Sequence, residues 1–182
     1  YIEKVNKIFS DGRHNAFTDI DIWKGKYYVV FRSADRHASP HEIGNPGKIG
    51  LGHITLLESH DGNEWSSSVI MDTQWDDRDA KLLSTNDRLY LFATIMHGEG
   101  YREASQETLV SYTEDGINWS DPVSAYRYGY GFWKPKKHDG FYYVAADVDQ
   151  SPPNSSIEQK GRVELLRSAD GLHWQNVSVI TE

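Results

Sequence analysis

Residues 76–79 bring three carboxylates and one guanidinium together in the order Asp-Asp-Arg-Asp. A carboxylate beside a guanidinium stays ionised unless burial opposes the charge. Asp79 could therefore act as a general base while a neighbouring acid with a raised pKa donates a proton. Hydrolysis of a glycosidic bond uses two such carboxyl groups, ~5 Å apart for retention or ~6.5–9.5 Å apart for inversion. The sequence favours Asp19 as the second carboxylate, with Asp147 as a further choice. The competing interpretation is a solvated acidic turn with an ion pair at a strand end.

Histidines in the polar stretches of the chain offer a different chemistry. His37, His41 and His97 could abstract a proton, helped by a tyrosine and by an arginine that neutralises a carboxylate. The reaction would then be β-elimination on a uronic acid, as in a polysaccharide lyase. The simpler alternative is that these histidines are exposed loop residues. The 8 histidines of the chain lie singly, without the close spacing of a zinc site, so we expect no metal ion and no other cofactor.

Cationic side chains are candidates for holding an anionic ligand. Arg32, Arg78 and Arg127 fall at or just beyond expected strand ends, and a planar guanidinium matches a carboxylate through two parallel hydrogen bonds. We expect Arg32 and Arg78 to bind the substrate together with Lys134, and we add His14 to this binding set. The alternative is that the arginines are ordinary surface residues.

Aromatic residues make up 13% of the chain, enough to supply both a core and a binding surface. An aromatic ring packs well on the apolar face of a sugar ring, so aromatic residues close to the long polar stretches are candidates for binding. These candidates are Trp75, Tyr101, Tyr128 and Trp133. Trp133 is equally well explained as a core residue.

A short motif that recurs three times must organise the elements that position these residues. It occupies residues 59–65, 113–119 and 168–174, and its Asp residues are separated by 54 and then 55 positions. Asp-Gly supplies the positive φ of a tight hairpin turn, and the hydroxyl and carboxylate oxygens can accept free backbone N–H groups. We therefore assign a structural role to Ser59, Asp61, Gly62, Trp65, Thr113, Asp115, Gly116, Trp119, Ser168, Asp170, Gly171 and Trp174.

Each copy of the motif lies near the end of a unit of about 50 residues, and each unit is predicted to form four antiparallel strands. Such a period is typical of β-propeller blades, and no segment shows a sustained helical pattern. We predict an all-β chain with blades at about 14–72, 76–126 and 131–182, and residues 1–9 as a stray strand of a neighbouring blade. Three blades cannot close a ring without exposing sheet edges. The chain is thus expected to be part of a longer propeller or to pair with a second copy into a six-bladed ring.

The connections between the predicted strands fall into two sets. Short turns at 24–25, 86–87 and 139–140 join the first two strands of each unit, on the same face as the three motifs. The long polar stretches lie on the opposite face, where most loop histidines and arginines also fall. Because function concentrates in long loops on a rigid scaffold, we expect the binding site on the long-loop face.

Bulk properties of the 182-residue chain exclude several classes of protein. A net charge of −8 and a pI near 5.4 argue against a nucleic-acid-binding surface. No apolar run approaches the ~20 residues of a membrane span. The chain contains no cysteine, so disulfides and thiol chemistry are excluded.

The recurring motif resembles the Asp box of the sialidase-like (BNR-type) β-propellers, whose longer form has one more residue between Asp and Gly. Residues 14–19, 28–32 and 78–82 are similar to stretches of bacterial glycosidase propellers. The resemblance implies a β-propeller of a superfamily that contains mostly glycan-active enzymes and some non-enzymatic binders. It also implies a secreted or periplasmic location.

For this chain, the resemblance implies a glycoside hydrolase acting on a saccharide, including anionic ones. The alternatives are a lyase that uses His and Tyr on uronic acids and a non-catalytic carbohydrate-binding propeller. The nucleophilic Tyr of sialidases, with its nearby Glu, would map onto Tyr126, Tyr128 or Tyr130. Lys134 stands before a proline where five-bladed glycosidases keep a Glu, so this chain departs from that group there.

Overall fold

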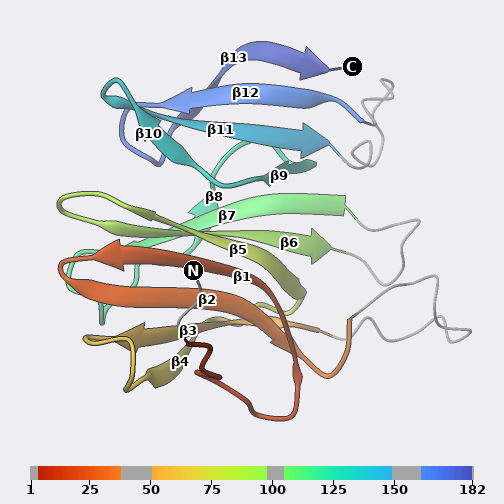
Figure 1. The fold of residues 1–182 in the computed structure, drawn as a ribbon. Helices are drawn as coiled ribbons and strands as arrows, with labels where there is room; N and C mark the ends of the chain where they lie inside the picture. The colour runs from red at the N-terminus through yellow and green to blue at the C-terminus, as the bar shows by residue number, and fades with distance from the viewer. Residues whose placement is uncertain (1–3, 38–50, 98–104, 149–160, 182) are drawn as a thin grey trace, which may run out of the picture.

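The computed structural model describes residues 4–37, 51–97, 105–148 and 161–181. These residues form thirteen β-strands and no helix, which confirms the predicted all-β class. The strands divide into three antiparallel sheets that are stacked one on another, with the first and third sheets at the two ends of the stack (Figure 1). This is the arrangement of a partial β-propeller.

The three sheets share one strand order. The first contains β1 (His14–Trp23), β2 (Lys26–Ala34), β3 (His53–Ser59) and β4 (Ser66–Met71). The second contains β5 (Asp76–Ser84), β6 (Leu89–His97), β7 (Ser105–Thr113) and β8 (Val123–Ser124). The third contains β9 (Tyr130–Phe132), β10 (Lys136–His138), β11 (Phe141–Val148), β12 (Val163–Ser168) and β13 (Trp174–Thr181). Residues 4–13 pair with no described strand, and their place in a neighbouring blade stays a prediction.

The innermost strand of each sheet is irregular at the same level. Pairing shifts between Ala16 and Asp19 in β1, and between Arg78 and Lys81 in β5. In the third sheet the same break separates β9 from β10, and both halves pair with β11. Bulges of this kind bend a strand and re-aim its side chains.

Apolar side chains between the sheets form two main core clusters. Tyr28, Val30 and Leu56 of the first sheet pack with Leu82 and Leu91 of the second. A second, more aromatic cluster lies between the second and third sheets and includes Phe92, Val110, Phe132, Val144 and Trp174. Alternating strand residues thus face opposite neighbours, which is why the central sheet is apolar on both sides.

The three recurring motifs form turns with the same hydrogen bonds. The backbone N–H of Gly62 donates to Ser59 Oγ (2.9 Å), and those of Asn63 and Glu64 donate to Asp61 Oδ1 (2.8 and 3.0 Å). Equivalent bonds occur in the second and third motifs. The N–H donors of Asn63 and Glu64 lower the pKa of Asp61 to about 2. In each motif the hydroxyl oxygen thus accepts the N–H of the turn glycine.

The pairing register shows which residues are equivalent between sheets. Tyr28, Tyr90 and Tyr143 each pair with the residue that precedes the hydroxyl residue of a turn motif. Their inner-strand partners are Asp21, Leu83 and Lys136. Counting back two residues from each makes Asp19 of β1, Lys81 of β5 and Lys134, in the break between β9 and β10, equivalent positions. No helix long and apolar enough to cross a membrane occurs in the part of the chain that the structure describes.

Candidate functional site

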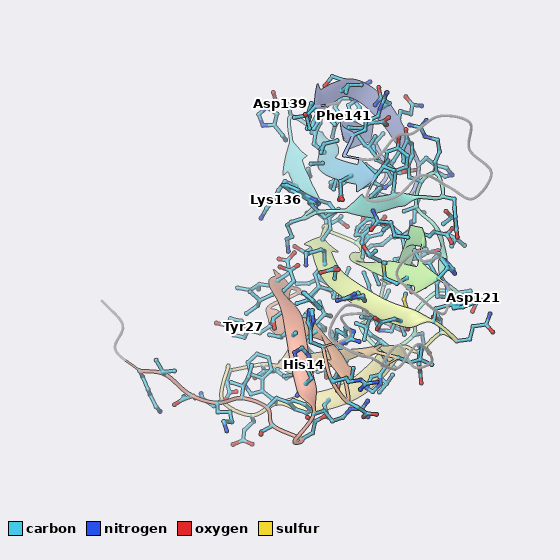
Figure 2. The ribbon with its side chains drawn as sticks, turned by 90° about the vertical axis from the view of Figure 1, so that its right-hand side faces the viewer. His14, Tyr27, Asp121, Lys136, Asp139 and Phe141 are labelled. Carbon is cyan, nitrogen blue, oxygen red and sulfur yellow. The ribbon has the colours of Figure 1, made fainter. Side chains whose placement is uncertain are left out.

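The predicted site residues gather on one side of the stack. Strands β2, β6 and β11 end there, on the right of Figure 1, and the innermost strands β1, β5 and β9 begin there. Figure 2 looks onto this side and shows His14 on β1. The long connections that the sequence assigned to one face join these strand ends, so we call this side the long-loop face.

A buried ion pair joins the first two sheets at this face. Arg32 donates from Nε and Nη2 to Asp76 Oδ1, each at 2.8 Å, and the two residues are 0% and 1% exposed. The backbone N–H of Gly52 donates to the same oxygen at 2.9 Å. A Cβ on Gly52 would lie 2.4 Å from Arg32 Nε, so only glycine fits there. Arg32, an expected substrate ligand, is therefore buried and held by Asp76.

Arg78 lies at the edge of this pair and remains partly exposed. Its Nε is 3.7 Å from Asp76 Oδ2, and its guanidinium lies 5.2 Å from the ring centre of Phe17. Within the described residues, neither Arg78 Nε nor Asp76 Oδ2 has a hydrogen-bond partner, although both atoms are buried. Leaving such groups unpaired costs ~1–3 kcal/mol each, and more for charged groups. This is the kind of cost that a binding site carries.

Two histidines extend the same cluster. The rings of His14 and His37 are 5.4 Å apart, and the ring of His37 is 5.7 Å from that of Phe17. Nδ1 of His14 is a third buried polar atom that has no partner in the described ranges. His14, His37 and Arg78 form what we call the His-Arg cluster, between the starts of β1 and β5.

Asp79 follows this cluster on β5, and its backbone is in the left-handed region with φ 46°. A residue with a side chain adopts this conformation at a cost of ~1–2 kcal/mol. The half-buried carboxylate makes no hydrogen bond or ion pair with any residue that the structure describes. Phe17 has a similar φ of 59° at the corresponding bulge of β1. Strain of this kind is concentrated at functional sites.

Asp19 has a different environment, because it links all three sheets. Its carboxylate forms an ion pair with Lys134 and accepts the backbone N–H of Leu82 at 2.8 Å. The sequence placed Asp19 and Lys134 in the same site, and the structure brings them into contact. The contact lies where the innermost strands approach one another, between β1, β5 and the break that separates β9 from β10.

His97 lies apart from His37, in a group of aromatic residues. Its ring is 5.3 Å from Trp75 and 5.6 Å from Tyr128, and its Nε2 is 3.2 Å from Glu107 Oε2. Trp133 is 58% exposed and donates from Nε1 to Asp147 Oδ1 at 3.0 Å, so it is a surface residue and not part of the core. The predicted positions His41 and Tyr101 lie outside the described residues.

A buried carboxylate that the sequence did not reveal lies between the second and third sheets. Glu164 is 1% exposed and accepts hydrogen bonds from Tyr126 (3.1 Å), Tyr130 (2.8 Å), Arg127 (2.7 Å) and Arg162 (2.9 Å). Burial and the bond to Glu164 raise the pKa of Tyr130 to about 12, which disfavours a nucleophilic phenolate. The partners are 34 to 38 residues from Glu164 except Arg162, so no local pattern marks the group.

Asp77 is the acid with a raised pKa beside Asp79. Burial raises the pKa of Asp77 to about 6, although the N–H and hydroxyl of Thr73 both bond to its carboxylate. Its side chain is fully buried, and it points to the opposite side of β5 from Asp76, which is buried as well. No group of three or more metal-ligating side chains occurs in the described ranges.

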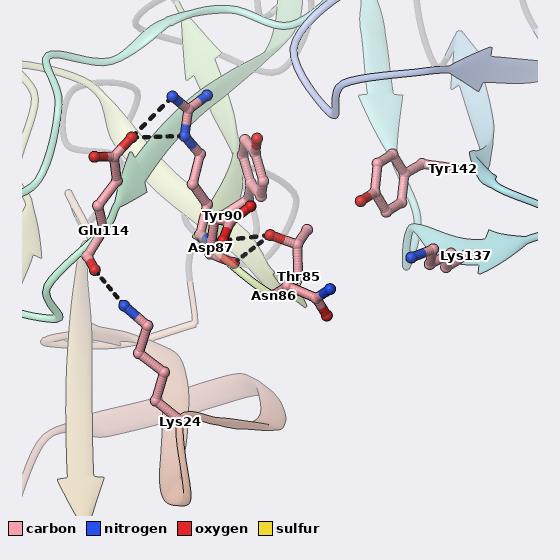
Figure 3. A pocket seen from close by; sticks show the side chains of 9 residues that line it. Lys24, Thr85, Asn86, Asp87, Tyr90, Glu114, Lys137 and Tyr142 are labelled. Atoms are coloured by element: carbon pink, nitrogen blue, oxygen red, sulfur yellow. Dashed lines mark hydrogen bonds and ion pairs between the residues drawn. The ribbon is translucent and has the colours of Figure 1, made fainter.

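A cavity of about 640 Å³ lies on the opposite, short-turn face (Figure 3). Its lining is Lys24, Thr85, Asn86, Asp87, Arg88, Tyr90, Glu114, Lys137 and Tyr142. Two of its three cations are already paired. Arg88 Nη2 lies 2.8 Å from Glu114 Oε1, and Lys24 Nζ donates to the Glu114 carbonyl at 2.6 Å. No local pattern of residues predicts this cavity, since its walls come from turns of all three sheets.

No family model and no curated protein matches the sequence. The structure is nevertheless similar to solved glycoside hydrolase-type β-propellers. One is the GH32 β-fructofuranosidase BmSUC1 of Bombyx mori, with a TM-score of 0.59 and 18% identity, over 92% of this chain and 35% of that chain. A second is a Trypanosoma rangeli sialidase in complex with 2,3-difluorosialic acid, with a TM-score of 0.63 and 14% identity, over 92% and 31%. A third is Zg3597, a family 117 glycoside hydrolase of Zobellia galactanivorans, with a TM-score of 0.58 and 13% identity, over 95% and 73%.

The chain spans about a third of the fructofuranosidase and of the sialidase. Identities of 13–18% show a shared fold and no more. The chain thus has the fold of glycoside hydrolase-type β-propellers.

Proposed function

We propose that this chain belongs to a glycan-active β-propeller and that its long-loop face binds and hydrolyses a saccharide. The observation that carries the proposal is Asp79. This carboxylate stands on a strained bulge of an innermost strand, without a described partner, next to the His-Arg cluster. The solved propellers with this fold that were described above are themselves carbohydrate-active enzymes, which favours a sugar over other ligands.

In this proposal Asp79 is the base or nucleophile, and Asp19 is the second carboxyl group of the pair. Lys134 and the Leu82 N–H hold Asp19 in one orientation at the meeting point of the innermost strands. Asp19 is therefore held in place by its partners, whereas Asp79 is accessible, and the two carboxylates have different environments. Different environments are what a catalytic pair of carboxyl groups needs.

Substrate binding is assigned to Arg78, His14 and Trp133. Arg78 presents a guanidinium whose Nε makes no hydrogen bond within the described residues, which suits a carboxylate or a pair of hydroxyl groups on a sugar. His14 offers a second unpaired ring nitrogen. Trp133 is exposed and its indole is fixed by Asp147, so its ring can pack on a sugar face without losing further freedom.

Hydrolysis of a panel of aryl glycosides and of neutral, sialylated and uronate-containing oligosaccharides tests the proposal. We expect Asp79→Asn to lower the rate on the accepted substrate ~10²–10⁴-fold, because it removes the proton-transfer group. The exposed Asp121 supplies the matched control Asp121→Asn, which should leave the rate unchanged. Asp19→Asn should also lower the rate, and its melting temperature must be measured beside it, since it breaks the contact to Lys134.

Each result separates this proposal from its rivals. Full hydrolysis by Asp79→Asn rejects the assignment of the base. An unsaturated product that absorbs in the ultraviolet, lost in His37→Ala or His97→Ala, would show a lyase. Binding on a glycan array without release of sugar would show a non-catalytic module.

A further inference from the structure

Neighbouring sheets meet through a repeated contact on the short-turn face. Tyr28 of the first sheet lies against Gly116 in the turn motif of the second, where a Cβ would be 2.8 Å from the Tyr28 hydroxyl oxygen. Tyr90 of the second sheet lies against Gly171 of the third in the same way, where a Cβ would be 3.1 Å from the Tyr90 ring. The Tyr90 hydroxyl also donates to the carbonyl of Asp170 at 2.8 Å. Each junction is therefore a tyrosine seated on the glycine of the next turn motif.

The third sheet carries the same tyrosine at its outer side. Tyr143 pairs with Arg167, as Tyr28 pairs with Glu58 and Tyr90 with Tyr112. The sheet is the last of the stack, so no described sheet covers Tyr143 as the second and third sheets cover Tyr28 and Tyr90 (Figure 1). Phe141, two residues before Tyr143, remains 37% exposed on the same sheet (Figure 2). This end of the stack therefore supplies the tyrosine of a further junction.

The first sheet supplies the turn glycine of such a junction. Gly62 stands in a turn motif with the same hydrogen bonds and the same positive φ (76°) as Gly116 and Gly171. Among the described residues, the only atom within 4 Å of a Cβ on Gly62 is a ring carbon of Tyr27 at 3.9 Å, so no described tyrosine of a preceding sheet is seated on it. A cavity of about 420 Å³ lies there, between residues 5–8 and the ring of Trp65. Its apolar walls include Val5, which is 83% exposed.

We propose that the occupant of this cavity is Tyr143 of a second copy of the chain. Within the described ranges, Tyr143 at one end of the stack has no turn glycine beside it, and Gly62 at the other end has no tyrosine seated on it. Two copies joined head to tail satisfy both ends at once, and two junctions of the kind already present within the chain close a ring of six sheets. A closed two-fold assembly of this type leaves no sheet face exposed.

The pairing also completes the innermost layer. Asp19, Lys81 and Lys134 occupy equivalent positions at the inner edges of the three sheets, and a second copy would bring three more inner edges to the same axis. The glycan site of the proposed function lies beside this layer, so the partner would supply its remaining wall. The pairing itself does not depend on that function.

Engineered cysteines test the junction directly, because the natural chain contains none. One preparation carries Tyr143→Cys and a second carries Asn63→Cys, and the two are mixed under mild oxidation. We expect a disulfide between the two different chains. The matched control is Ile117→Cys, since Ile117 is the equivalent residue of the second turn motif and is 81% exposed. It should form no disulfide with Tyr143→Cys above background.

Light scattering of the unmodified chain gives the second measurement. We expect twice the mass of 20.8 kDa. Tyr143→Ala should weaken the association ~10-fold or more, as for a central aromatic residue of an interface, whereas Tyr143→Phe should change it little. A folded chain of single mass at all concentrations would overturn the proposal, as would a dimer that forms no disulfide between positions 143 and 63. If the chain forms the dimer but hydrolyses no glycan, the proposed function is rejected and the proposed junction is not.

Discussion

The two faces of the stack are built from the two ends of the same strands, yet they differ in how many of their polar groups are left without a hydrogen bond. On the short-turn face, the aspartates of the turn motifs accept two backbone N–H groups each, and Arg88 is paired with Glu114. On the long-loop face, polar atoms of His14, Asp76 and Arg78 are buried without a hydrogen bond to any described residue. Both ends of the strands hold sheets together, since Arg32 and Asp76 join the first two sheets on the long-loop face. Within the described ranges, only the long-loop face also retains buried polar groups that a ligand can satisfy.

The largest expected difference between the two faces concerns two arginines that each pair with a carboxylate. We expect Arg32→Met to lower the free energy of unfolding by ~3–5 kcal/mol, because Asp76 would keep a buried charge without its partner. Arg88→Met breaks a solvent-exposed pair on the short-turn face and should cost ~1 kcal/mol or less. Chemical denaturation of the two variants measures the difference. Equal losses would mean that the two faces are not distinct in this respect.

Two glycines with the same backbone conformation separate turn geometry from junction packing. Gly171→Ala should cost ~3 kcal/mol, since the new methyl group meets the Tyr90 ring as well as a φ of +82°. Gly140→Ala has a φ of +80° but nothing within 4 Å of its Cβ, so it should cost only ~1–2 kcal/mol. Thermal melting of both variants provides the readout. If Gly140→Ala and Gly171→Ala are equally unstable, the contact between Gly171 and Tyr90 does not contribute to the loss of stability.

Asp77 on the long-loop face and Asp61 on the short-turn face should make the free energy of unfolding depend on pH in opposite directions. The folded pKa of Asp77 is about 6, above the ~3.9 of an unfolded aspartate, so this group stabilises the fold fully only below ~pH 4 and stability falls as the pH rises to 6. The folded pKa of Asp61 is about 2, so its contribution is present above ~pH 4 and is lost as the pH falls through 2.

Asp77→Asn should therefore flatten the stability profile between pH 4 and 6. At pH 7 the variant should be more stable than the natural chain, by on the order of 2 kcal/mol if the bonds to Thr73 persist. Urea titrations at pH 4, 5, 6 and 7 would show the effect. An unchanged slope in the variant would assign the pH dependence to other groups.

The smallest expected effect concerns strain at Asp79. Because glycine adopts a φ of 46° without penalty, Asp79→Gly should raise the free energy of unfolding by up to ~1 kcal/mol while it abolishes the proposed hydrolysis. Ala80→Gly, at the next residue of β5, is the control and should lower stability. If Asp79→Gly is also destabilising, the carboxylate has a structural role, and its lack of described partners loses its significance.

Much of the fold could be predicted because its signals are local. Asp-Gly and Trp at a fixed spacing specify the turns, and alternating apolar residues specify the strands between them. The choice of the long-loop face followed from connection lengths alone. Arg78, Asp79 and His14 were selected because they stand at the starts of predicted innermost strands, and the structure places them on that face.

The sequence by itself determined the strand order, the turn motifs and the face on which charged side chains collect, since each depends on residues within one unit. Only the tertiary structure decided which of those side chains meet. Arg32 and Asp76 are 44 residues apart, and Asp19 and Lys134 are 115 apart, so their contacts depend on how one sheet packs against the next. Packing buried Arg32 fully while it left Arg78 partly exposed, and it separated His37 from His97. Burial and partner distance come from long-range contacts, and no local pattern of residues contains them.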